Sequence, residues 1–531
     1  MLLIACVNVA NLLLARGAAR QKELAIRCAL GATRRRVVRQ LITESLLLGF
    51  LGGIAGIIVA AAGLRLLMPF LPASLQFLPF RQIGAITIDG RVFLFALLLA
   101  CFTGILFGLA PALGTRRAQL NDPLKEGGGR GLTSAGGNGL RHALVAAEVA
   151  LALIVLAGAG LMIDSMARLL GVNPGLNPKN VLTMDVSTAQ VDLYNGPPVD
   201  ARFCEELAEH VGAIPGVVSV SGISHLPLGG GSAGRGFSIE GAPDPGPEHE
   251  PGGGYGVACP NFFRTMGIPL VEGREFTDTD AVNSANVVVM NEAMAHRYWP
   301  KGGALGAHIK LGAFNENAPW MTVVGIVANF RHDGLDANPR PYFYRPFTQA
   351  GWPFMTVVMR TRSAPASFEH AARTALAQMS GDYPASGVLT MEQIVSDSLG
   401  SYRFPMLLLS AFALLALALS AVGIAGVVGY SVVQRTHEIG IRMALGAQRR
   451  DVLKLVLGAS MLWTFGGIIA GIARALGLTR LLGDLLYGVQ PADPLILGAT
   501  AVVLAAVAFV ACYVPARRAM RVDPMVALRY E

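Results

Sequence analysis

Charged side chains are scarce in this chain. Only 15% of its 531 residues are Asp, Glu, Lys or Arg, whereas 53% are hydrophobic and the mean hydropathy is +0.50. Soluble globular domains carry roughly 25% charged residues, so the composition excludes an ordinary soluble protein of this length. The shortage of charge instead predicts a protein with many membrane-spanning segments.

The sequence also lacks the motifs that mark common enzymes. It contains no G-x-x-x-x-G-K-[ST] nucleotide loop, no H-E-x-x-H and no C-x-x-C. Ser232 stands in a formal G-x-S-x-G, but the glycine stretch 229–236 supplies neither the strand nor the helix of a nucleophile elbow, so we interpret it as a mobile loop. His332 and Asp333 are neighbours without a third partner, which favours a turn over an acid/base pair. We expect no catalytic residue, no metal and no cofactor bound by this chain.

What the sequence does contain is a series of apolar runs. Each is about twenty residues long, the length that crosses roughly 30 Å of hydrocarbon. The first run, Met1–Leu14, is shorter and lacks the flanks of a signal peptide. We expect about seven spans, the first one truncated. The complete ones lie near 44–68, 91–113, 141–166, 404–431, 455–476 and 494–515.

A second feature is an internal repeat. Residues 23–35 read ELAIRCALGATRR, and residues 438–450 read EIGIRMALGAQRR. Glu23, Ile26, Arg27, Leu30, Gly31, Arg34 and Arg35 recur at a constant offset as Glu438, Ile441, Arg442, Leu445, Gly446, Arg449 and Arg450. A duplicated unit decides the architecture of a chain. On the same offset Val7 aligns with Val422, so Met1 falls inside a span, and we expect the first copy to be truncated at its start.

The repeat and the spans together predict the domain organisation. We expect a polytopic α-helical membrane protein with a duplicated three-span unit and one large α+β extracytoplasmic domain. The predicted parts are a first permease-like unit at 1–113, a glycine-rich cytoplasmic linker at 114–140, the span at 141–166, the extracytoplasmic domain at 167–400 and the second unit at 401–531.

Charge sets the expected orientation. The net charge is +8, and Lys and Arg crowd the two repeat segments and the C-terminal tail, whereas 167–400 is richer in acidic residues. Basic residues beside spans stay on the cytoplasmic side, so we expect the C-terminus inside and 167–400 outside. The basic clusters abut spans and lack interleaved aromatics, which argues against nucleic-acid binding.

The repeated segment has the pattern of a short amphipathic helix. Gly31 and Gly446 stand where a helix ends on a left-handed residue, and Thr33 can cap the helix that follows. From the residues alone, two interpretations have equal weight. The segment is either an interfacial helix on anionic headgroups or a docking surface for a cytoplasmic partner.

These residues carry a family resemblance. The E-x-x-I-R-x-A-L-G-A-x-R-R segment, the spans around it and the closing DPMVALRYE resemble the permease subunits of MacB/FtsX-type ABC transporters, in particular the duplicated permeases described mainly from acidobacteria. EGREFTDTD, VVVMNEAMAHRYWP and WMTVVGIVANFRHDGL resemble the extracytoplasmic domain of the same family. The first copy departs from the family because it lacks that domain.

The resemblance implies a function and its partners. It implies a multi-pass permease of the bacterial inner membrane whose repeated segments dock a separate ABC ATPase, which would use the ATP, and it implies export or efflux. A membrane-fusion protein or another periplasmic protein is a further implied partner, beside the lipid bilayer. The alternative function is a regulatory or signalling scaffold that moves nothing and acts through its extracytoplasmic domain.

Within 167–400 the pattern predicts alternating strands and helices. Strands are expected at 181–186, 217–221, 287–290, 322–327 and 356–359, helices at 202–214, 292–299 and 368–379, and a surface loop at 243–251.

A few isolated polar residues complete the expectations. Cys204 and Cys259 are the cysteines that face an oxidising compartment and are able to bridge, although the sequence favours two free thiols. Glu148 and Arg474 lie in or beside spans. A charge inside a span is a candidate functional site, but both residues are close enough to an interface that we favour contact with the interface or pairing.

Overall fold

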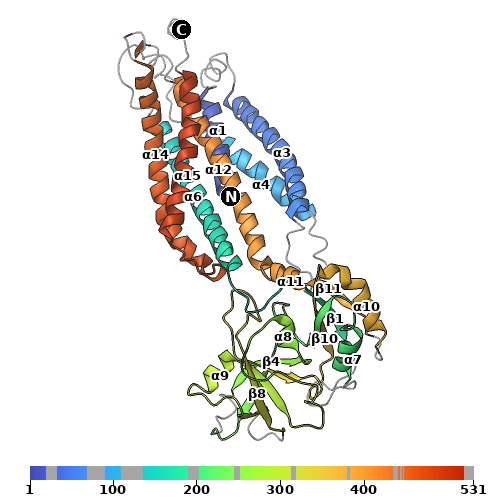
Figure 1. Ribbon diagram of the computed structural model, residues 1–531. Coiled ribbons are helices and arrows are strands. Elements are labelled where there is room, and N and C mark those ends of the chain that lie inside the picture. Colours follow the sequence, from blue (N-terminus) through green and yellow to red (C-terminus); the bar gives the residue numbers. More distant parts are fainter. Residues whose placement is uncertain are drawn as a thin grey trace. The chain divides into compact units, whose positions relative to one another are not determined.

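The chain divides into two compact units. One comprises Met1–Leu71, Pro79–Arg168 and Tyr402–Glu531 and is called here the membrane unit; the other comprises Pro72–Leu78 and Leu169–Ser401 and is called the α+β unit. Figure 1 shows the computed structural model coloured along the sequence. The structure describes residues 1–19, 33–67, 90–108, 135–188, 202–243, 251–312, 318–379, 383–434, 441–442, 445 and 448–519.

The described part of the membrane unit is helical. Its elements are α1 (Leu2–Ala19), α3 (Arg34–Leu67), α4 (Gly90–Gly108), α6 (Ala135–Leu170), α12 (Gly400–Gln434), α14 (Arg449–Leu478), the 3₁₀ turn η5 (Thr479–Leu485) and α15 (Pro494–Ala519). Among the described residues, five helical stretches are long and apolar enough to cross a membrane: Ile42–Leu66, Arg141–Leu170, Gly400–Val433, Leu453–Leu481 and Pro494–Arg518. Helix α4 spans 19 residues, and Leu2–Asn11 is a shorter apolar helix. The predicted polytopic α-helical architecture is confirmed.

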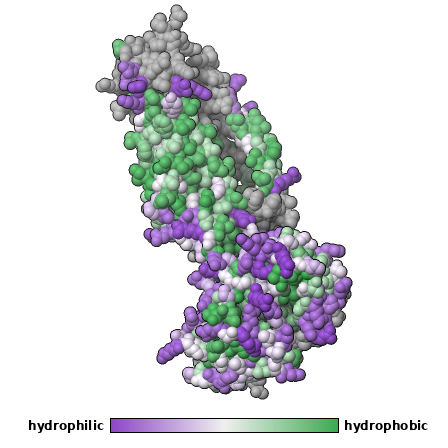
Figure 2. Space-filling view, viewed as in Figure 1, coloured by the Kyte–Doolittle hydropathy of each residue, from purple (hydrophilic) through white to green (hydrophobic). Residues whose placement is uncertain are grey.

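The surface of these helices explains why they require a membrane. Apolar residues cover the visible described face, and hydrophilic residues gather near the helix ends (Figure 2). Lipid tails can cover such an apolar surface without a protein partner. The backbone N–H and C=O groups pair within each helix, so none of them has to face the hydrocarbon unpaired. Helix α6 begins at Ala135, inside the range expected to be linker.

The core of the membrane unit lies where α6 meets α1, α12, α14 and α15. Val149, Leu153, Ala416, Ala475 and Leu504 are fully or almost fully buried there. Small residues bring α14 against α6, because a methyl group at Gly467 would lie 2.6 Å from the Ala146 carbonyl oxygen. Close approach through small residues is the usual way in which membrane helices associate.

The two isolated charges behave differently from each other. Arg474 is exposed near the end of α14, as expected of a residue that reaches an interface. Glu148 has no exposed surface and hydrogen-bonds the side chain of Asn8 on α1. The expectation that Glu148 pairs is therefore met, whereas the alternative that it reaches an interface is wrong, because α1 covers it.

The α+β unit is built on one continuous sheet. Its strands are β1 (Val181–Ser187), β2 (Val217–Ile223), β3 (Ala233–Ile239), β4 (Gly252–Ala258), β5 (Leu270–Gly273), β6 (Val287–Asn291), β7 (His308–Leu311), β8 (Met321–Val327), β9 (Tyr342–Pro346), β10 (Phe354–Thr361) and β11 (Ser386–Thr390). Its helices are α7 (Phe203–His210), α8 (Phe262–Met266), α9 (Glu292–Tyr298), the 3₁₀ turn η4 (Pro365–Phe368), α10 (Glu369–Ala377) and α11 (Met391–Ser398).

The sheet has two parts. Strands β11, β1, β10 and β2 form an antiparallel series in that order, and β2 continues onto β4. From β4 the order runs through β3, β7, β8, β6 and β9, and a parallel pairing of β9 with β4 closes these strands into a ring. Phe203, Phe237, Phe343 and Val357 lie fully buried in the core against this sheet.

All five predicted strands are present with nearly the predicted bounds, and three helices occur where helices were expected. Six strands were not predicted, namely β3, β4, β5, β7, β9 and β11, and two of them, β3 and β4, are rich in glycine. Residues 233–239, partly assigned to a mobile loop, form β3 and pair with β4, whose sequence is GGGYGVA. Glycine is required in β4 because a methyl group at Gly256 would lie 2.8 Å from the Tyr344 ring of β9. Most of the predicted loop 243–251 lies outside the described residues.

The expectation for the two outside cysteines is also corrected. Cys204 of α7 and Cys259, which follows β4, form a disulfide with a Cα–Cα distance of 5.6 Å. Strand pairing brings together two residues that are 55 positions apart in the chain. Nothing in their local sequence indicates this proximity.

Candidate functional site

The repeated segment is the candidate site, and the structure describes part of its second copy. Ile441 and Arg442 are helical, and the Leu445 amide donates to the Ile441 carbonyl at 3.0 Å. Arg449 and Arg450 then open α14, as Arg34 and Arg35 open α3 in the first copy. Glu23, Ile26, Arg27, Leu30, Gly31, Glu438 and Gly446 lie outside the described residues. Their role as ATPase-coupling residues stays a prediction.

The described residues of this segment are exposed. Leu445 keeps 83% of its surface accessible and Ile441 keeps 41%, and Arg442 is exposed beside them. A leucine this exposed next to arginines is an unusual surface for water alone. Partner docking and contact with headgroups both need exposed side chains, so this exposure does not distinguish the two interpretations, and the role of the segment stays a prediction.

The junction into α14 is held by a capping interaction. Asp451, in the first turn of α14, accepts a hydrogen bond from the backbone amide of Gln448 at 3.1 Å. The equivalent junction in the first copy is Thr33, and α3 begins directly after it at Arg34, as the predicted cap requires. The hydrogen bond from Gln448 to Asp451 stabilises the first turn of α14, which directly follows the repeated segment in the second copy.

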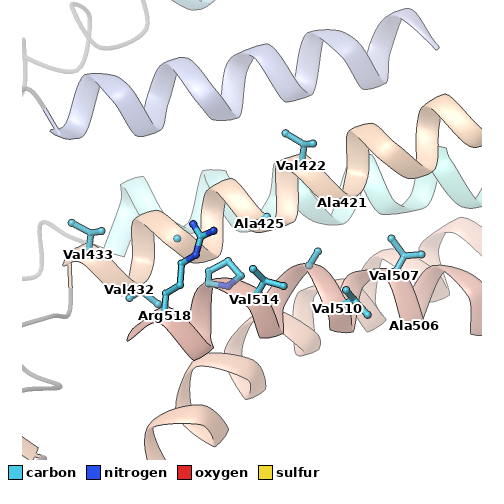
Figure 3. A pocket seen from close by; sticks show the side chains of 13 residues that line it. Ala421, Val422, Ala425, Val432, Val433, Ala506, Val507, Val510, Val514 and Arg518 are labelled. Atoms are coloured by element: carbon cyan, nitrogen blue, oxygen red, sulfur yellow. The ribbon is translucent and has the colours of Figure 1, made fainter. Parts of the chain in front are cut away.

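A groove lies between α12 and α15 in the same unit. It encloses about 960 Å³ and is lined mainly by alanine and valine, with Arg518 near one end (Figure 3). Val422, Val432, Val510 and Val514 form its walls. Its described lining carries one charged side chain and no set of polar groups that would orient a small molecule. The groove is therefore the kind of apolar seam that two lipid-facing helices leave between them.

The other sequence candidate, the neighbouring His332 and Asp333, separates into two unrelated contacts. The His332 ring is buried and stacks on Tyr342 at 4.2 Å between centroids, and burial lowers the pKa of His332 to about 3. Asp333 pairs with Arg340 at 2.7 Å. A histidine that stays neutral and a carboxylate that faces an arginine do not form an acid/base pair.

Within the described ranges no three His, Cys, Asp or Glu side chains lie close enough together to hold a metal ion.

Family models match most of the chain. Residues 1–120 and 410–524 both match the FtsX-like permease C-terminal model, and residues 143–375 match the MacB-like periplasmic core domain. The first model thus recurs on both sides of the second. This recurrence agrees with the internal repeat, because the two matched regions contain its two copies.

Curated relatives give the same picture. The chain is 30% identical over 294 residues to the pyoverdine export ATP-binding/permease protein PvdT of Pseudomonas putida, covering 52% of this chain and 43% of that protein. It is 28% identical over 280 residues to the macrolide export ATP-binding/permease protein MacB of Chromobacterium violaceum, covering 51% and 42%. An uncharacterized ABC transporter permease of Bacillus subtilis, YvrN, is 27% identical, covering 52% and 70%. The chain thus spans about half the length of the export relatives that it matches.

Among solved structures, the periplasmic region of MacB from Actinobacillus actinomycetemcomitans matches 43% of this chain and 96% of its own. The sequence identity is 15% and the TM-score is 0.29.

Proposed function

Because this chain is a permease of the MacB/FtsX type, we propose that it transmits ATP-driven movement of a separate ATPase across the membrane to its α+β unit. The observation that carries the proposal is the arrangement of the matches. Two permease regions flank one MacB-like periplasmic core domain. The matched regions are permease domains, and the sequence has no nucleotide-binding loop, so the proposal assigns ATP hydrolysis to a partner.

The proposal includes an orientation. Arg450, Lys454, Arg517 and Arg518 stand at the ends of α14 and α15 that adjoin the repeated segment and the C-terminal tail. Basic residues beside spans favour the cytoplasmic side, so these ends and the C-terminus face the cytoplasm in a bacterial inner membrane. The α+β unit is then periplasmic. There it is available to a further partner, for which a membrane-fusion protein is the candidate.

Transmission would start at the repeated segments. ATP binding draws two nucleotide-binding subunits together, and each would press on one segment through exposed groups such as Leu445 and Arg442. The helices beside the second segment, α12 and α14, run for 35 and 30 residues. Long helices of this kind move as rigid rods, so displacement at one end reaches the other.

We further propose that the work done is export. The named relatives are export proteins, one for pyoverdine and one for macrolides, and both combine an ATP-binding and a permease part in one protein. A permease-only chain would need the ATP-binding part from a separate subunit. One chain with two repeated segments would dock two such subunits.

The test is co-purification of the ATPase with variants of each segment. The double change Glu438→Ala, Arg442→Ala removes two opposite charges four positions apart in the sequence, a spacing that puts them one turn apart in the helix that the pattern predicts. An exposed pair contributes less than about 1 kcal/mol to folding, so expression and insertion should be unchanged. Loss of charge contacts buried at a partner interface costs about 2–5 kcal/mol of association. Permease-stimulated ATP hydrolysis should therefore fall by at least about tenfold.

The repeat supplies the matched control. Leu445→Asp should remove one of two bound ATPases, Leu30→Asp should remove the other, and the combined variant should remove both. Lys454→Ala, one turn inside α14, should leave both bound. If all variants bind and stimulate the ATPase normally, the segments only anchor the chain to headgroups, and the signalling-scaffold alternative gains support.

A further inference from the structure

The carboxyl of Glu148 is buried in the membrane unit, and the proposed transmission of movement gives it no role. It lies on α6 about two turns from Arg141, at the start of the apolar span Arg141–Leu170. Glu148 is 0% exposed, and its partner Asn8 on α1 is 4% exposed. A carboxylate without a cation is costly to bury in protein and more costly still within a membrane.

One oxygen of this carboxyl has a hydrogen-bond partner and the other has none. Asn8 Nδ2 donates to Glu148 Oε1 and also to the Leu419 carbonyl oxygen of α12, the latter at 2.9 Å. The other two oxygens, Glu148 Oε2 and Asn8 Oδ1, are buried without a hydrogen-bond partner. Both converge on Gly423 of α12, where a methyl group would lie 2.5 Å from Oε2 and 2.7 Å from Oδ1. A proton on Glu148 Oε2 would supply the donor that both of these buried acceptor oxygens lack.

Among the described side chains, no cation pairs with the carboxyl. On α6, the nearest charged or titratable groups are Arg141, which lies 4.2 Å over the Tyr430 ring of α12, and His142, which stacks on Trp463 of α14. The thiols of Cys6 on α1 and Cys512 on α15 belong to the same bundle. Among the described residues, the Asn8 amide is the one group that hydrogen-bonds the Glu148 carboxyl.

We propose that Glu148 is a proton-binding site of the membrane unit. Its carboxyl carries a proton on Oε2 and donates it to Asn8 Oδ1, while Asn8 Nδ2 donates to Oε1. The result is a neutral acid–amide pair with two hydrogen bonds. When the proton leaves, it goes to water, and a bare carboxylate then faces the Asn8 carbonyl oxygen. This repulsion favours either rotation of the amide or entry of water between α1 and α6.

The position of the pair gives the proton a structural consequence. Asn8 and Gly423 occupy equivalent positions in the two copies of the repeat, and both contact Glu148. The protonated pair thus joins a helix of the first copy to two helices of the second. Asn11, one turn along α1, and Ser420 on α12 are also buried with unpartnered polar atoms, so water has groups to bind if the pair opens.

Infrared difference spectroscopy of the full chain in lipid nanodiscs at neutral pH tests the proposal. Wild-type protein should show the C=O stretch of a protonated carboxylic acid that disappears in Glu148→Gln. The control Asp164→Asn removes an exposed carboxylate paired with Arg168, and it should remove no such band. An unchanged acid C=O region, with loss of carboxylate stretches instead, in the Glu148→Gln protein would mean that Glu148 is ionised, and that overturns the proposal.

A second variant tests the pair itself. Asn8→Leu deletes the amide while leaving Glu148 in place, so the acid band should shift toward that of an acid without a hydrogen-bonded partner. Glutamine mimics the neutral acid, so Glu148→Gln should keep the wild-type denaturation temperature at neutral pH. As the pH rises, wild type should lose thermal stability that Glu148→Gln retains. An acid band that does not move in Asn8→Leu would overturn the pairing, whatever the ATPase does.

Discussion

Helices α3 and α14 occupy equivalent positions in the two copies of the repeat. Each carries a pair of glycines four residues apart, Gly52 and Gly56 in α3 and Gly467 and Gly471 in α14. On α14 both glycines lie against α6, where methyl groups would come within 2.6 and 3.1 Å of its backbone. On α3, a methyl group added at either glycine would have no described atom within 4 Å apart from the local backbone of its own helix.

The difference shows that a packing motif and a packing contact are separate things. The glycine pair makes a helix able to approach a neighbour closely, but the approach requires a neighbour. Helix α14 has α6 beside it. Within its apolar window α3 has no buried residue, and its described contacts are chiefly with α4. The same glycine spacing therefore contributes to a core in α14, whereas in α3 it meets no neighbour among the described residues.

The largest expected effect comes from filling the glycine pair. Gly471→Leu should destabilise the membrane unit by about 3 kcal/mol, because the new side chain has to displace the Ala150 and Leu153 atoms that already lie at contact distance. Gly56→Leu is the matched change in the first copy. It should shift the free energy of unfolding by less than about 0.5 kcal/mol, since the position is open.

Thermal unfolding in detergent micelles, followed by the helical circular dichroism signal, measures both variants. Equal losses in the two proteins would show that α3 has a neighbour as close as α6, and the comparison would then fail. An intermediate loss in Gly56→Leu would indicate that chains associate through α3, and dilution of the protein should then reduce it.

The next largest effect concerns the α+β unit, which separates the first two described helices of the second copy. Asp280 is almost completely buried there and receives two hydrogen bonds from Arg274, at 2.7 and 2.8 Å, and one from the Thr277 amide. Burial alone would raise the pKa of Asp280, but the bonds from Arg274 and Thr277 outweigh it and the pKa is lowered. Asp280→Asn should cost about 2 kcal/mol at neutral pH.

The sign of the pH effect follows from the lowered pKa. Asp280 contributes its full stabilisation above the unfolded value of 3.8 and loses it as the pH falls through the lower folded value. Wild type and Asp280→Asn should therefore converge in stability in strong acid. Three of the four tryptophans, Trp299, Trp320 and Trp352, lie in the α+β unit, so fluorescence follows its unfolding. Asp333→Asn, at a half-exposed pair, should cost less than about 1 kcal/mol.

The sequence predicted those parts of the fold in which a residue's own neighbours determine its environment. The apolar runs became membrane helices because about twenty apolar residues have few other options, and the alternating runs at 287–290 and 322–327 became β6 and β8 for a similar reason. Strand β4 was missed because its glycines leave room for the tyrosine rings of β9, and β9 comes about ninety residues later in the chain. A pattern of period two cannot show such a contact.

The same distinction between local sequence and long-range contacts applies to the candidate functional residues. The repeated segment could be found because duplication is visible in the sequence itself. The depth of Glu148 could not, because it depends on α1, which precedes Glu148 by more than a hundred residues. The disulfide of Cys204 and Cys259 likewise depends on where the strands bring their ends together. In each case the missing information is a long-range contact rather than a local preference.

The smallest expected effect returns to the two equivalent helices, at their first turns. Asp451 caps α14 by accepting from the Gln448 amide, whereas the equivalent position in α3 is Arg36, which offers no carboxylate. Asp451→Ala should cost about 1 kcal/mol, and Arg36→Asp should gain up to about 1 kcal/mol because it adds both a cap and a favourable charge at a helix N-terminus. Amide hydrogen exchange in the first turn of each helix is the suitable measurement, since local opening reports a cap more directly than global unfolding. Exchange should quicken at the start of α14 in the first variant and slow at the start of α3 in the second. If Arg36→Asp leaves exchange unchanged, α3 gains nothing from a cap, and the two helices differ at their ends as well as along their faces.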